Sequence, residues 1–185
     1  MVKLSILIPT VKEDEDLLME LLEELSIQIE PYGSSIQILI DYDEYESIGR
    51  KRNKLMEKAT GDYVACFDSD DKPSIYYIDW MMKVVESGCD CGSFLGLYSE
   101  NGVALGKFEH SLKYKKWETT QGEIKYLRFP NHLNAVKTEI AKQFKFSEKN
   151  HGEDFDWSTL LHESGLLKTE FNIPEIIYYY NKVTK

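Results

Sequence analysis

The chain is organised around the stretch GDYVACFDSDD at residues 61–71. Its apolar run, Tyr63 to Phe67, predicts a short buried strand. The strand ends in the carboxylates of Asp68, Asp70 and Asp71, which would repel one another unless a positive group lay nearby. Divalent cations prefer such oxygen ligands, and ligands of open α/β sheets gather where strands end. Two interpretations stay open on this stretch alone: a metal site, or an Asp71 that caps a following helix beside two solvated carboxylates.

The composition predicts one globular domain rather than a nucleic-acid or membrane protein. The 185 residues suffice for a single core, and the formal net charge of −10 argues against binding to nucleic acid or anionic membranes. No apolar run approaches the ~18 residues of a transmembrane helix, and no secretory signal pattern opens the chain. The three cysteines include no CxxC pair and no disulfide framework, so we expect a cytoplasmic location.

The residues before this stretch predict a β-α-β-α order. Apolar runs and helical periodicity indicate a strand at Leu4–Ile8, a helix at about Glu15–Ile29 capped by Asp14, a strand at Ile36–Ile40 and a helix at Ser47–Ala59 capped by Ser47. Strands joined by crossover helices are typical of parallel sheets. We therefore expect an α/β fold with a mixed, mainly parallel central sheet flanked by helices.

The residues after it predict a different, antiparallel region. The pattern indicates a helix at Ser74–Ser87, a hairpin of Asp90–Tyr98 and Val103–Glu109, a second hairpin of Leu112–Glu118 and Glu123–Phe129, helices at about Val136–Gln143 and Phe155–Ser164, and an aromatic strand at Phe171–Tyr180 interrupted at Pro174. Asn101-Gly102 favours a tight turn in the first hairpin, because both residues tolerate positive φ. Trp117 and Tyr126 of the second hairpin would either stack on a sugar or pack across strands.

Two further polar clusters admit a structural and a functional interpretation. Arg50, Lys51 and Arg52, followed by Asn53, form either a solvated helical face or a phosphate site near a helix start. The segment NHGEDFDW at residues 150–157 either caps a helix with its carboxylates or places a catalytic base there.

The order of these elements resembles the family 2 glycosyltransferases of the GT-A fold. That family shows an opening IPT strand, an ARN helix, a GDYIxFxDSDD strand and a late GEDxD/W element. Here the corresponding residues are 8–10, Arg52-Asn53, residues 61–71 and Gly152-Glu153-Asp154. The resemblance runs from Leu4 to about Leu161, although the segment between the second strand and the ARN-like helix is shorter than usual. It implies one Rossmann-like GT-A domain over residues 1–185, with a nucleotide-sugar-binding half (1–72) and an acceptor-side half (73–185).

The resemblance also implies an activity and a set of site residues. The expected enzyme is a metal-dependent, inverting glycosyltransferase of the hexosyltransferase type, which moves a sugar from a nucleotide-diphosphate donor, UDP-sugar first, to a carbohydrate or other hydroxyl-bearing acceptor. Mn²⁺ or Mg²⁺ would be held by Asp70 and Asp68, with His132 preferred over His151 as a further ligand, and Asp154 would be the general base. The expected donor-binding residues are Pro9, Thr10, Asp41, Lys51, Arg52, Asn53, Asp68, Ser69 and Glu153. For Arg52 two roles stay open: adding charge to the diphosphate or orienting Asp68.

Two other functions remain possible on the sequence. Nucleotidyltransferases also combine paired aspartates with a parallel sheet, but they usually carry a Gly-rich phosphate loop near the N-terminus, and this chain has none there. A non-catalytic module that binds a nucleotide or glycan would not need the full set of Asp68, Asp70 and Asp154.

Overall fold

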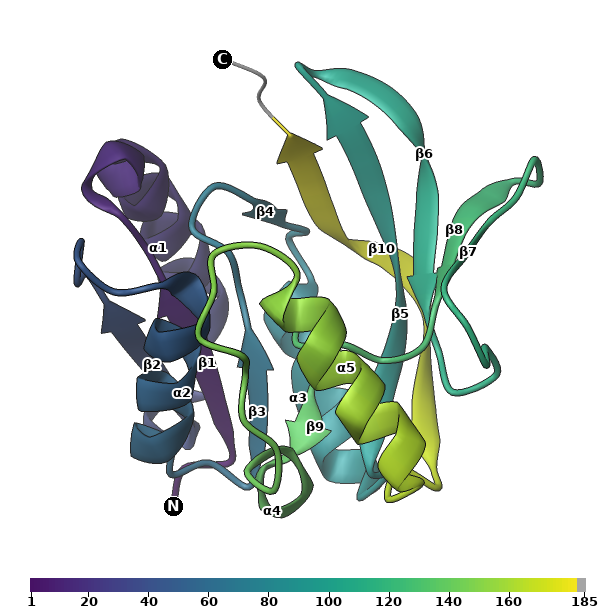
Figure 1. Cartoon of the computed structure of the whole chain (residues 1–185). Helices are drawn as coiled ribbons and strands as arrows, with labels where there is room; N and C mark the ends of the chain where they lie inside the picture. Colours follow the sequence, from purple (N-terminus) through teal and green to yellow (C-terminus); the bar gives the residue numbers. More distant parts are fainter. Residues whose placement is uncertain (183–185) are drawn as a thin grey trace.

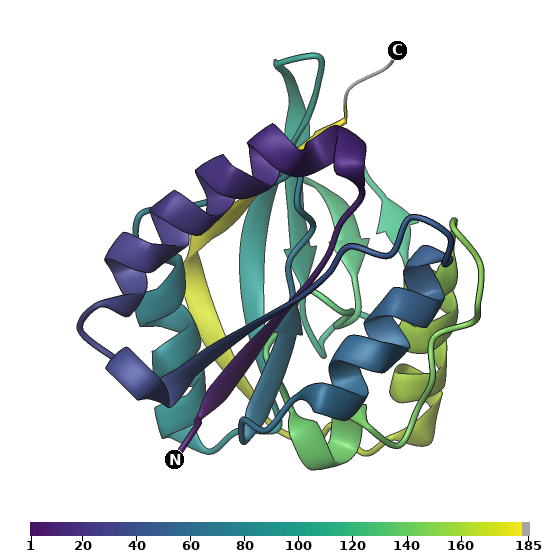
Figure 2. The ribbon, with the colours of Figure 1, turned by 90° about the vertical axis from the view of Figure 1, so that its left-hand side faces the viewer.

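The first half of the chain forms the parallel part of one mixed sheet. In the computed structural model, which describes residues 1–182, β1 (Leu4–Pro9) pairs in parallel with β2 (Ile36–Asp41) and with β3 (Tyr63–Cys66). The helices α1 (Glu15–Ile29) and α2 (Ile48–Lys58) connect these strands and lie on opposite faces of them (Figure 2). This is the β-α-β-α order expected from the sequence, including Ser47, whose Oγ accepts from the Arg50 amide as an N-cap.

The second half continues the same sheet with both antiparallel and parallel pairs. β5 (Cys91–Glu100) pairs antiparallel with β6 (Val103–His110), as the sequence predicts. β8 (Ile124–Arg128) instead runs parallel to β6, and the short β7 (Glu118–Thr119) pairs antiparallel with β8 at the edge. The strand β10 (Glu170–Lys182) returns parallel to β5 and also pairs with β4 (Lys72–Pro73) (Figure 1). The main path of the sheet is β2-β1-β3-β9-β5-β6-β8-β7.

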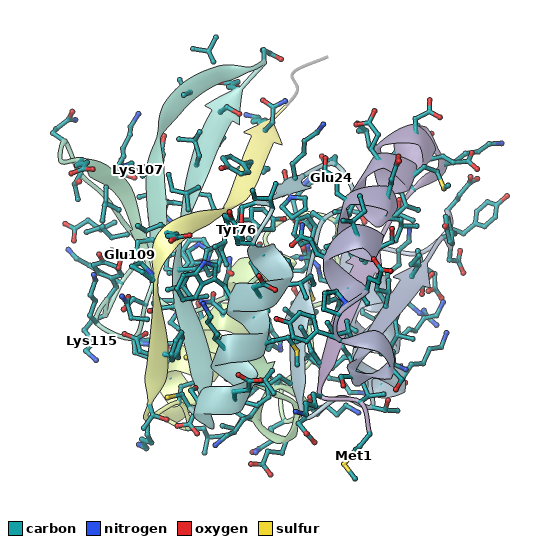
Figure 3. The ribbon with its side chains drawn as sticks, turned by 180° about the vertical axis from the view of Figure 1, so that it is seen from behind. Met1, Glu24, Tyr76, Lys107, Glu109 and Lys115 are labelled. Carbon is teal, nitrogen blue, oxygen red and sulfur yellow. The ribbon has the colours of Figure 1, made fainter. Side chains whose placement is uncertain are left out.

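Two apolar cores lie on the two faces of this sheet. Alternate residues of β1, such as Leu4 and Ile6, pack with α1 and with α3 (Tyr77–Ser87), which Figure 3 shows side by side. Leu7 faces the other core, formed with α2, α4 (Thr138–Ala141) and α5 (Glu153–Ser164). The mixed α/β architecture predicted from the sequence is therefore confirmed. Among residues 1–182, no helix has both the length and the apolar character of a membrane span.

The structure corrects several local predictions in the second half. Residues 112–117 form turns instead of a strand, because the Glu170 carboxylate accepts from Ser111 Oγ and the Leu112 amide and so takes the place of a strand partner. β9 (Val136–Lys137), which the sequence did not predict, bridges β3 and β5. Its two residues are too few to show a period. The predicted helix at 136–143 is accordingly reduced to α4.

Two turn predictions had opposite outcomes. Asn101 and Gly102 adopt φ angles of 50° and 78°, as the hairpin turn requires. Asp14, by contrast, makes no side-chain cap for α1; its carboxylate accepts from Ser69 Oγ at 3.4 Å instead. Pro174 does not interrupt β10, although the pairing with β5 shifts register between Asn172 and Ile176.

Candidate active site

A cleft opens where β1 and β3 end and α5 begins. It has a volume of about 480 Å³. Its walls include residues 9–11 at the end of β1, the Asp68–Asp70 loop after β3, and residues 150–154 before and within α5. Individual residues from α2, β10 and the loops also line it. This is the edge at which open α/β sheets bind ligands.

Two glycines allow α5 to begin beside α2. Gly152, the residue before α5, has a φ of 75°, a left-handed conformation that side chains resist. At Gly49, a Cβ atom would stand 1.9 Å from the carbonyl oxygen of Ser147, so only glycine lets α2 approach the loop that leads to α5. The amide of Ile48 also donates to Asn150 Oδ1 at 3.0 Å. These contacts fix the start of α5 against α2.

Arg52 joins the loop after β3 to the first residue of α5. Its side chain is 4% exposed, its Nη2 lies 2.6 Å from Asp68 Oδ1, and its Nη1 forms a close ion pair with Glu153 Oε1. Burial alone would lower the pKa of Arg52, but the two carboxylates raise it above the usual arginine value. Of the two roles left open for Arg52, this geometry favours the orientation of Asp68 and, with it, of Glu153.

Asp68 is an anion held by two basic side chains. Burial would raise the pKa of its carboxyl, but Arg52 and His132 bring that pKa well below its ordinary value. His132 Nε2 lies 3.6 Å from Asp68 Oδ2, a distance too long for a hydrogen bond. Both ring nitrogens of His132 are buried without a hydrogen-bond partner among residues 1–182, so this imidazole has unused capacity beside the cleft.

The interpretation of Asp71 as the cap of the following helix is wrong. Its carboxylate is buried and accepts from the Tyr178 hydroxyl at 2.6 Å and from the Asn181 amide at 3.3 Å, and α3 begins only at Tyr77. Burial and the nearby charge of Asp68 raise the pKa of Asp71 well above its usual range. Asp71 therefore ties the loop to β10.

Asp70 lines the cleft and forms no ion pair with a basic side chain of residues 1–182. The residue is exposed, yet desolvation by the surrounding protein, followed by the charges of Asp68 and Asp14, raises its pKa to about 6. Negative charge at this point is thus under-compensated, as expected of a carboxylate that receives a cation or a positively charged complex.

The side chains of this cleft are of the types that bind a hard divalent cation. Carboxylate oxygens and an unpartnered imidazole are suitable ligands, and Mg²⁺ is commonly held by one or two carboxylates together with phosphates of the substrate. In residues 1–182, no three His, Cys, Asp or Glu side chains converge tightly enough to form a complete site by themselves. Asp70, Asp68 and His132 therefore remain predicted ligands, and substrate oxygens would have to complete the set.

Asp154 lies where this cleft meets a second pocket. The second pocket, which we call the aromatic pocket, has a volume of about 340 Å³. Its walls include aromatic side chains of β5, β6, β8 and β10 and, on the side of the cleft, the carboxylates of Asp68, Asp71 and Asp154. Asp154 and Asp68 line both cavities, as do His132 and Tyr180. Asp154 is half-buried in the first turn of α5. A group bound in either cavity would thus meet the same carboxylate.

The predicted donor-binding residues separate into two groups. Pro9, Thr10, Arg52, Asp68, Ser69 and Glu153 line the cleft. Lys51, Asn53 and Asp41 do not, because each side chain is used within the protein. Lys51 Nζ donates to the Thr10 carbonyl at 2.6 Å, Asn53 Nδ2 donates to the Phe146 carbonyl at 2.9 Å, and Asp41 Oδ2 pairs with Lys54 at 3.2 Å. These three shape the frame of the cleft.

Sequence analysis missed several residues of the two cavities. Asp14, Asn150 and Tyr180 line the cleft, and Arg128 and Tyr98 line the second pocket. The run Tyr178-Tyr179-Tyr180 carried a usable signal. Because side chains alternate along a strand, Tyr178 and Tyr180 share a face, and both reach the Asp68–Asp71 region.

Comparison with known proteins supports the resemblance read from the sequence. No protein-family model matches the chain. An uncharacterized glycosyltransferase of Methanocaldococcus jannaschii is 31% identical over 119 residues, which cover 59% of this chain and 39% of the relative. The chain thus spans well under half of the length of this curated relative.

Solved structures of S. aureus TarS share the fold. The complex of TarS residues 1–349 with UDP-GlcNAc matches with a TM-score of 0.66 and 17% identity over 100% of this chain and 60% of that one. The complex with UDP gives 0.66 and 18% over 97% and 60%, and the longer TarS chain gives 0.55 and 16% over 97% and 37%. The chain therefore has the GT-A glycosyltransferase fold that its sequence motifs indicate.

Proposed function

We propose that this chain is the catalytic domain of a metal-dependent, inverting glycosyltransferase that uses a UDP-sugar. One observation carries the proposal: the buried Arg52 forms ion pairs with both Asp68 and Glu153. It thereby keeps the Asp68–Asp71 loop close to the start of α5, so that Asp68 and Asp154 line the same cleft. The relative named as a glycosyltransferase and the TarS complexes with UDP and UDP-GlcNAc support the choice of reaction and of donor.

The cleft between residues 9–11 and α5 is assigned to the donor. Residues Thr10 and Ser69 supply polar groups along it, and Asp70 would hold a Mn²⁺ or Mg²⁺ ion together with the donor diphosphate. Such an ion, when bound, supplies Lewis-acid stabilisation of the charge that develops on the leaving diphosphate. Asp68 is kept anionic and oriented by Arg52, which suits a hydrogen bond to the ribose or a share of the cation.

Asp154 is assigned the role of general base. It lies at the junction of the donor cleft and the aromatic pocket, where an acceptor hydroxyl would face the sugar of the donor. The acceptor oxygen forms the new bond to the anomeric carbon, the bond from that carbon to the diphosphate breaks, and the hydroxyl proton passes to Asp154. Attack from the side opposite the diphosphate inverts the configuration at the anomeric carbon.

We also include a cytoplasmic location in the proposal. All three cysteines, Cys66, Cys89 and Cys91, are free thiols in the structure, and Cys66 and Cys91 are buried. Burial raises the pKa of the Cys66 thiol to about 12, so it acts as an inert core side chain rather than a reactive one. Free thiols of this kind are typical of reducing compartments.

Donor hydrolysis tests the proposed function without knowledge of the acceptor. UDP-, GDP-, CMP- and dTDP-sugars are incubated with the protein and Mn²⁺, and released nucleotide is measured. The proposal predicts metal-dependent release of UDP above all others, and thermal stabilisation by UDP only when Mn²⁺ is present. Stabilisation by nucleoside triphosphates but not diphosphates would favour a nucleotidyltransferase. Binding of UDP without turnover would favour a non-catalytic module.

A further inference from the structure

The aromatic pocket contains a continuous line of stacked side chains. Tyr180 stacks on Tyr98 with ring centres 5.2 Å apart, and Tyr98 meets Tyr126 edge-on at 5.5 Å. The guanidinium of Arg128 lies 5.5 Å from the Tyr126 ring and 5.0 Å from the Trp117 ring. We call these five side chains the aromatic ladder. It begins at Tyr180, which also lines the donor cleft, and ends at Arg128 and Trp117.

Arg128 is the single Lys or Arg among the residues that line this pocket. It follows Tyr126 by two positions on β8, so both side chains project from the same face of the strand. Its Nη1 donates to the carbonyls of Glu118 at 2.7 Å and Leu127 at 2.9 Å. These bonds occupy two of the five N–H groups of a guanidinium and leave Nε and Nη2 for a ligand.

No carboxylate neutralises Arg128. Within residues 1–182 it forms no ion pair, whereas Arg52 is held between Asp68 and Glu153. Burial lowers the pKa of Arg128, and no Asp or Glu opposes that effect. The indole Nε1–H of Trp117 is also buried without an acceptor in the part of the chain that the structure describes. A partly desolvated cation and an unsatisfied donor thus lie together at one end of the pocket.

We propose that the aromatic pocket binds an acceptor that carries an anionic group, a phosphate or a carboxylate, on a sugar. The anion lies on Arg128, and the carbon skeleton lies against the rings of the aromatic ladder. A planar guanidinium matches two oxygens of either anion, and ring faces suit the C–H faces of a sugar. A neutral acceptor would leave Arg128 desolvated and unpaired. This inference rests on the proposed function, because it places the acceptor hydroxyl toward Asp154.

An NMR titration locates the binding and measures its dependence on charge. The indole Nε1–H signal of Trp117, assigned with a Trp117→Phe variant, is followed while glucose, glucose 6-phosphate or glucuronate is added to the whole chain. We expect at least roughly tenfold tighter binding of an anionic sugar than of glucose, because a charge-assisted, two-point contact is gained. The two anionic probes distinguish phosphate from carboxylate recognition.

Two charge-removing variants on neighbouring strands separate the contribution of Arg128 from general electrostatics. Arg128→Gln should abolish the preference for the anionic sugar. Arg128→Lys should retain part of it, because lysine keeps the positive charge but lacks the two parallel N–H groups of a guanidinium. Lys107→Gln removes an equal charge from a side chain of the neighbouring strand β6 that lies outside the pocket and pairs with Glu123 at 2.6 Å, and it should keep the preference. The dispersion of the amide spectrum checks that each variant is folded.

The inference fails under three results. These are equal affinity for glucose and both anionic sugars, no shift of the Trp117 signal with any probe, and an anion preference that survives Arg128→Gln. Its failure is distinct from failure of the proposed function. Metal-dependent UDP-sugar hydrolysis without an anion preference would overturn only the inference about the acceptor. Anion binding at Trp117 in a protein that hydrolyses no nucleotide sugar would overturn the proposed function instead.

Discussion

The two cavities of this protein meet at Asp154 but are built from different chemistry. The donor-side cleft lies at the ends of parallel strands and is rich in charge, with Arg52 neutralised by two carboxylates. The aromatic pocket lies on β5, β6, β8 and β10, where β5 and β6 pair antiparallel but β8 runs parallel to β6 and β10 parallel to β5. Its Arg128 forms no ion pair within residues 1–182. The same residue type thus occurs in two settings. The buried arginine paired with two carboxylates holds parts of the protein together, and Arg128 is the proposed contact for an anionic ligand.

The largest expected effect concerns Asp154, one of the two carboxylates that line both cavities. Asp154→Asn keeps the shape of the side chain but cannot accept the proton, so transfer and donor hydrolysis should fall by roughly 10³-fold while UDP affinity stays within a factor of about two. Turnover is measured by UDP release and affinity by calorimetry. The matched control is Asp156→Asn on the same helix, because Asp156 binds Ser147 Oγ and Lys149 outside both cavities and should be dispensable for turnover. Wild-type turnover in Asp154→Asn would show that another group is the base.

The second prediction concerns Arg52 and the free energy of unfolding. Arg52→Gln removes the buried cation that pairs with Asp68 and Glu153, and it should lower the free energy of unfolding by about 3–5 kcal/mol. Urea unfolding measures this difference. Arg50→Gln, on the same helix but 56% exposed and paired with Glu46, should cost less than about 1 kcal/mol. Equal costs for the two variants would mean that the buried pair does not hold the cleft together.

Asp70 tests the metal on the donor side. Asp70→Asn should weaken the binding of UDP in the presence of Mn²⁺ by at least about tenfold and leave metal-free binding of UDP nearly unchanged, since the lost group acts through the cation. Calorimetry with Mn²⁺ and with a chelator separates the two conditions. Asp62→Asn, an exposed aspartate before the start of β3, is the control. A loss that is equal with and without metal would argue against Asp70 as a ligand.

The smallest effect lies at the opposite end of the sheet, far from both cavities. Although burial opposes it, hydrogen bonds from the Lys168 amide, Lys137 Nζ and Thr169 lower the pKa of Asp90 to about 2. A carboxyl whose pKa is lower in the folded state stabilises that state at neutral pH, and this contribution disappears as the pH falls from about 4 to about 2.

Asp90→Asn should therefore lower the unfolding free energy by about 1–2 kcal/mol at neutral pH, where the carboxylate contributes fully. Urea unfolding of both proteins should show this difference shrinking toward pH 2, and UDP-sugar turnover should be unchanged at neutral pH. A difference that stays constant with pH would show that the lost hydrogen bonds do not depend on the charge of Asp90. A loss of turnover would show that the two ends of the sheet are coupled.

The donor half could be predicted from sequence because its signals are contiguous. The strand of residues 63–67 and the carboxylates that follow it stand together in the chain, and periodicity alone located β1, α1, β2 and α2. In the second half the first hairpin, two helices and the last strand could also be predicted, but the aromatic pocket could not. That pocket is assembled from β5, β6, β8 and β10, whose pairing depends on tertiary contacts. Tyr98, Arg128 and Tyr180 are ordinary strand residues until that pairing stacks them.

The candidate site shows the same limit at single residues. Arg52, Lys51 and Asn53 stand together in the basic cluster, and sequence alone assigned all three to the donor. The helix turns them in different directions, so that Arg52 reaches the cleft, Lys51 supports the Thr10 carbonyl and Asn53 holds the backbone of Phe146. Resemblance to a motif identified the segment, and only the helical geometry separated the residue that lines the cleft from the two that support it.

The central claim is that the donor lies in the charged cleft with its sugar directed toward Asp154. A crystal structure with a non-hydrolysable UDP-sugar and Mn²⁺ tests it most directly. We predict a diphosphate and a cation at Asp70, between Thr10 and the start of α5, and an anomeric carbon whose face opposite the diphosphate is turned toward Asp154 and the aromatic pocket. A nucleotide bound elsewhere, or a sugar with that face turned away from Asp154, would contradict the account.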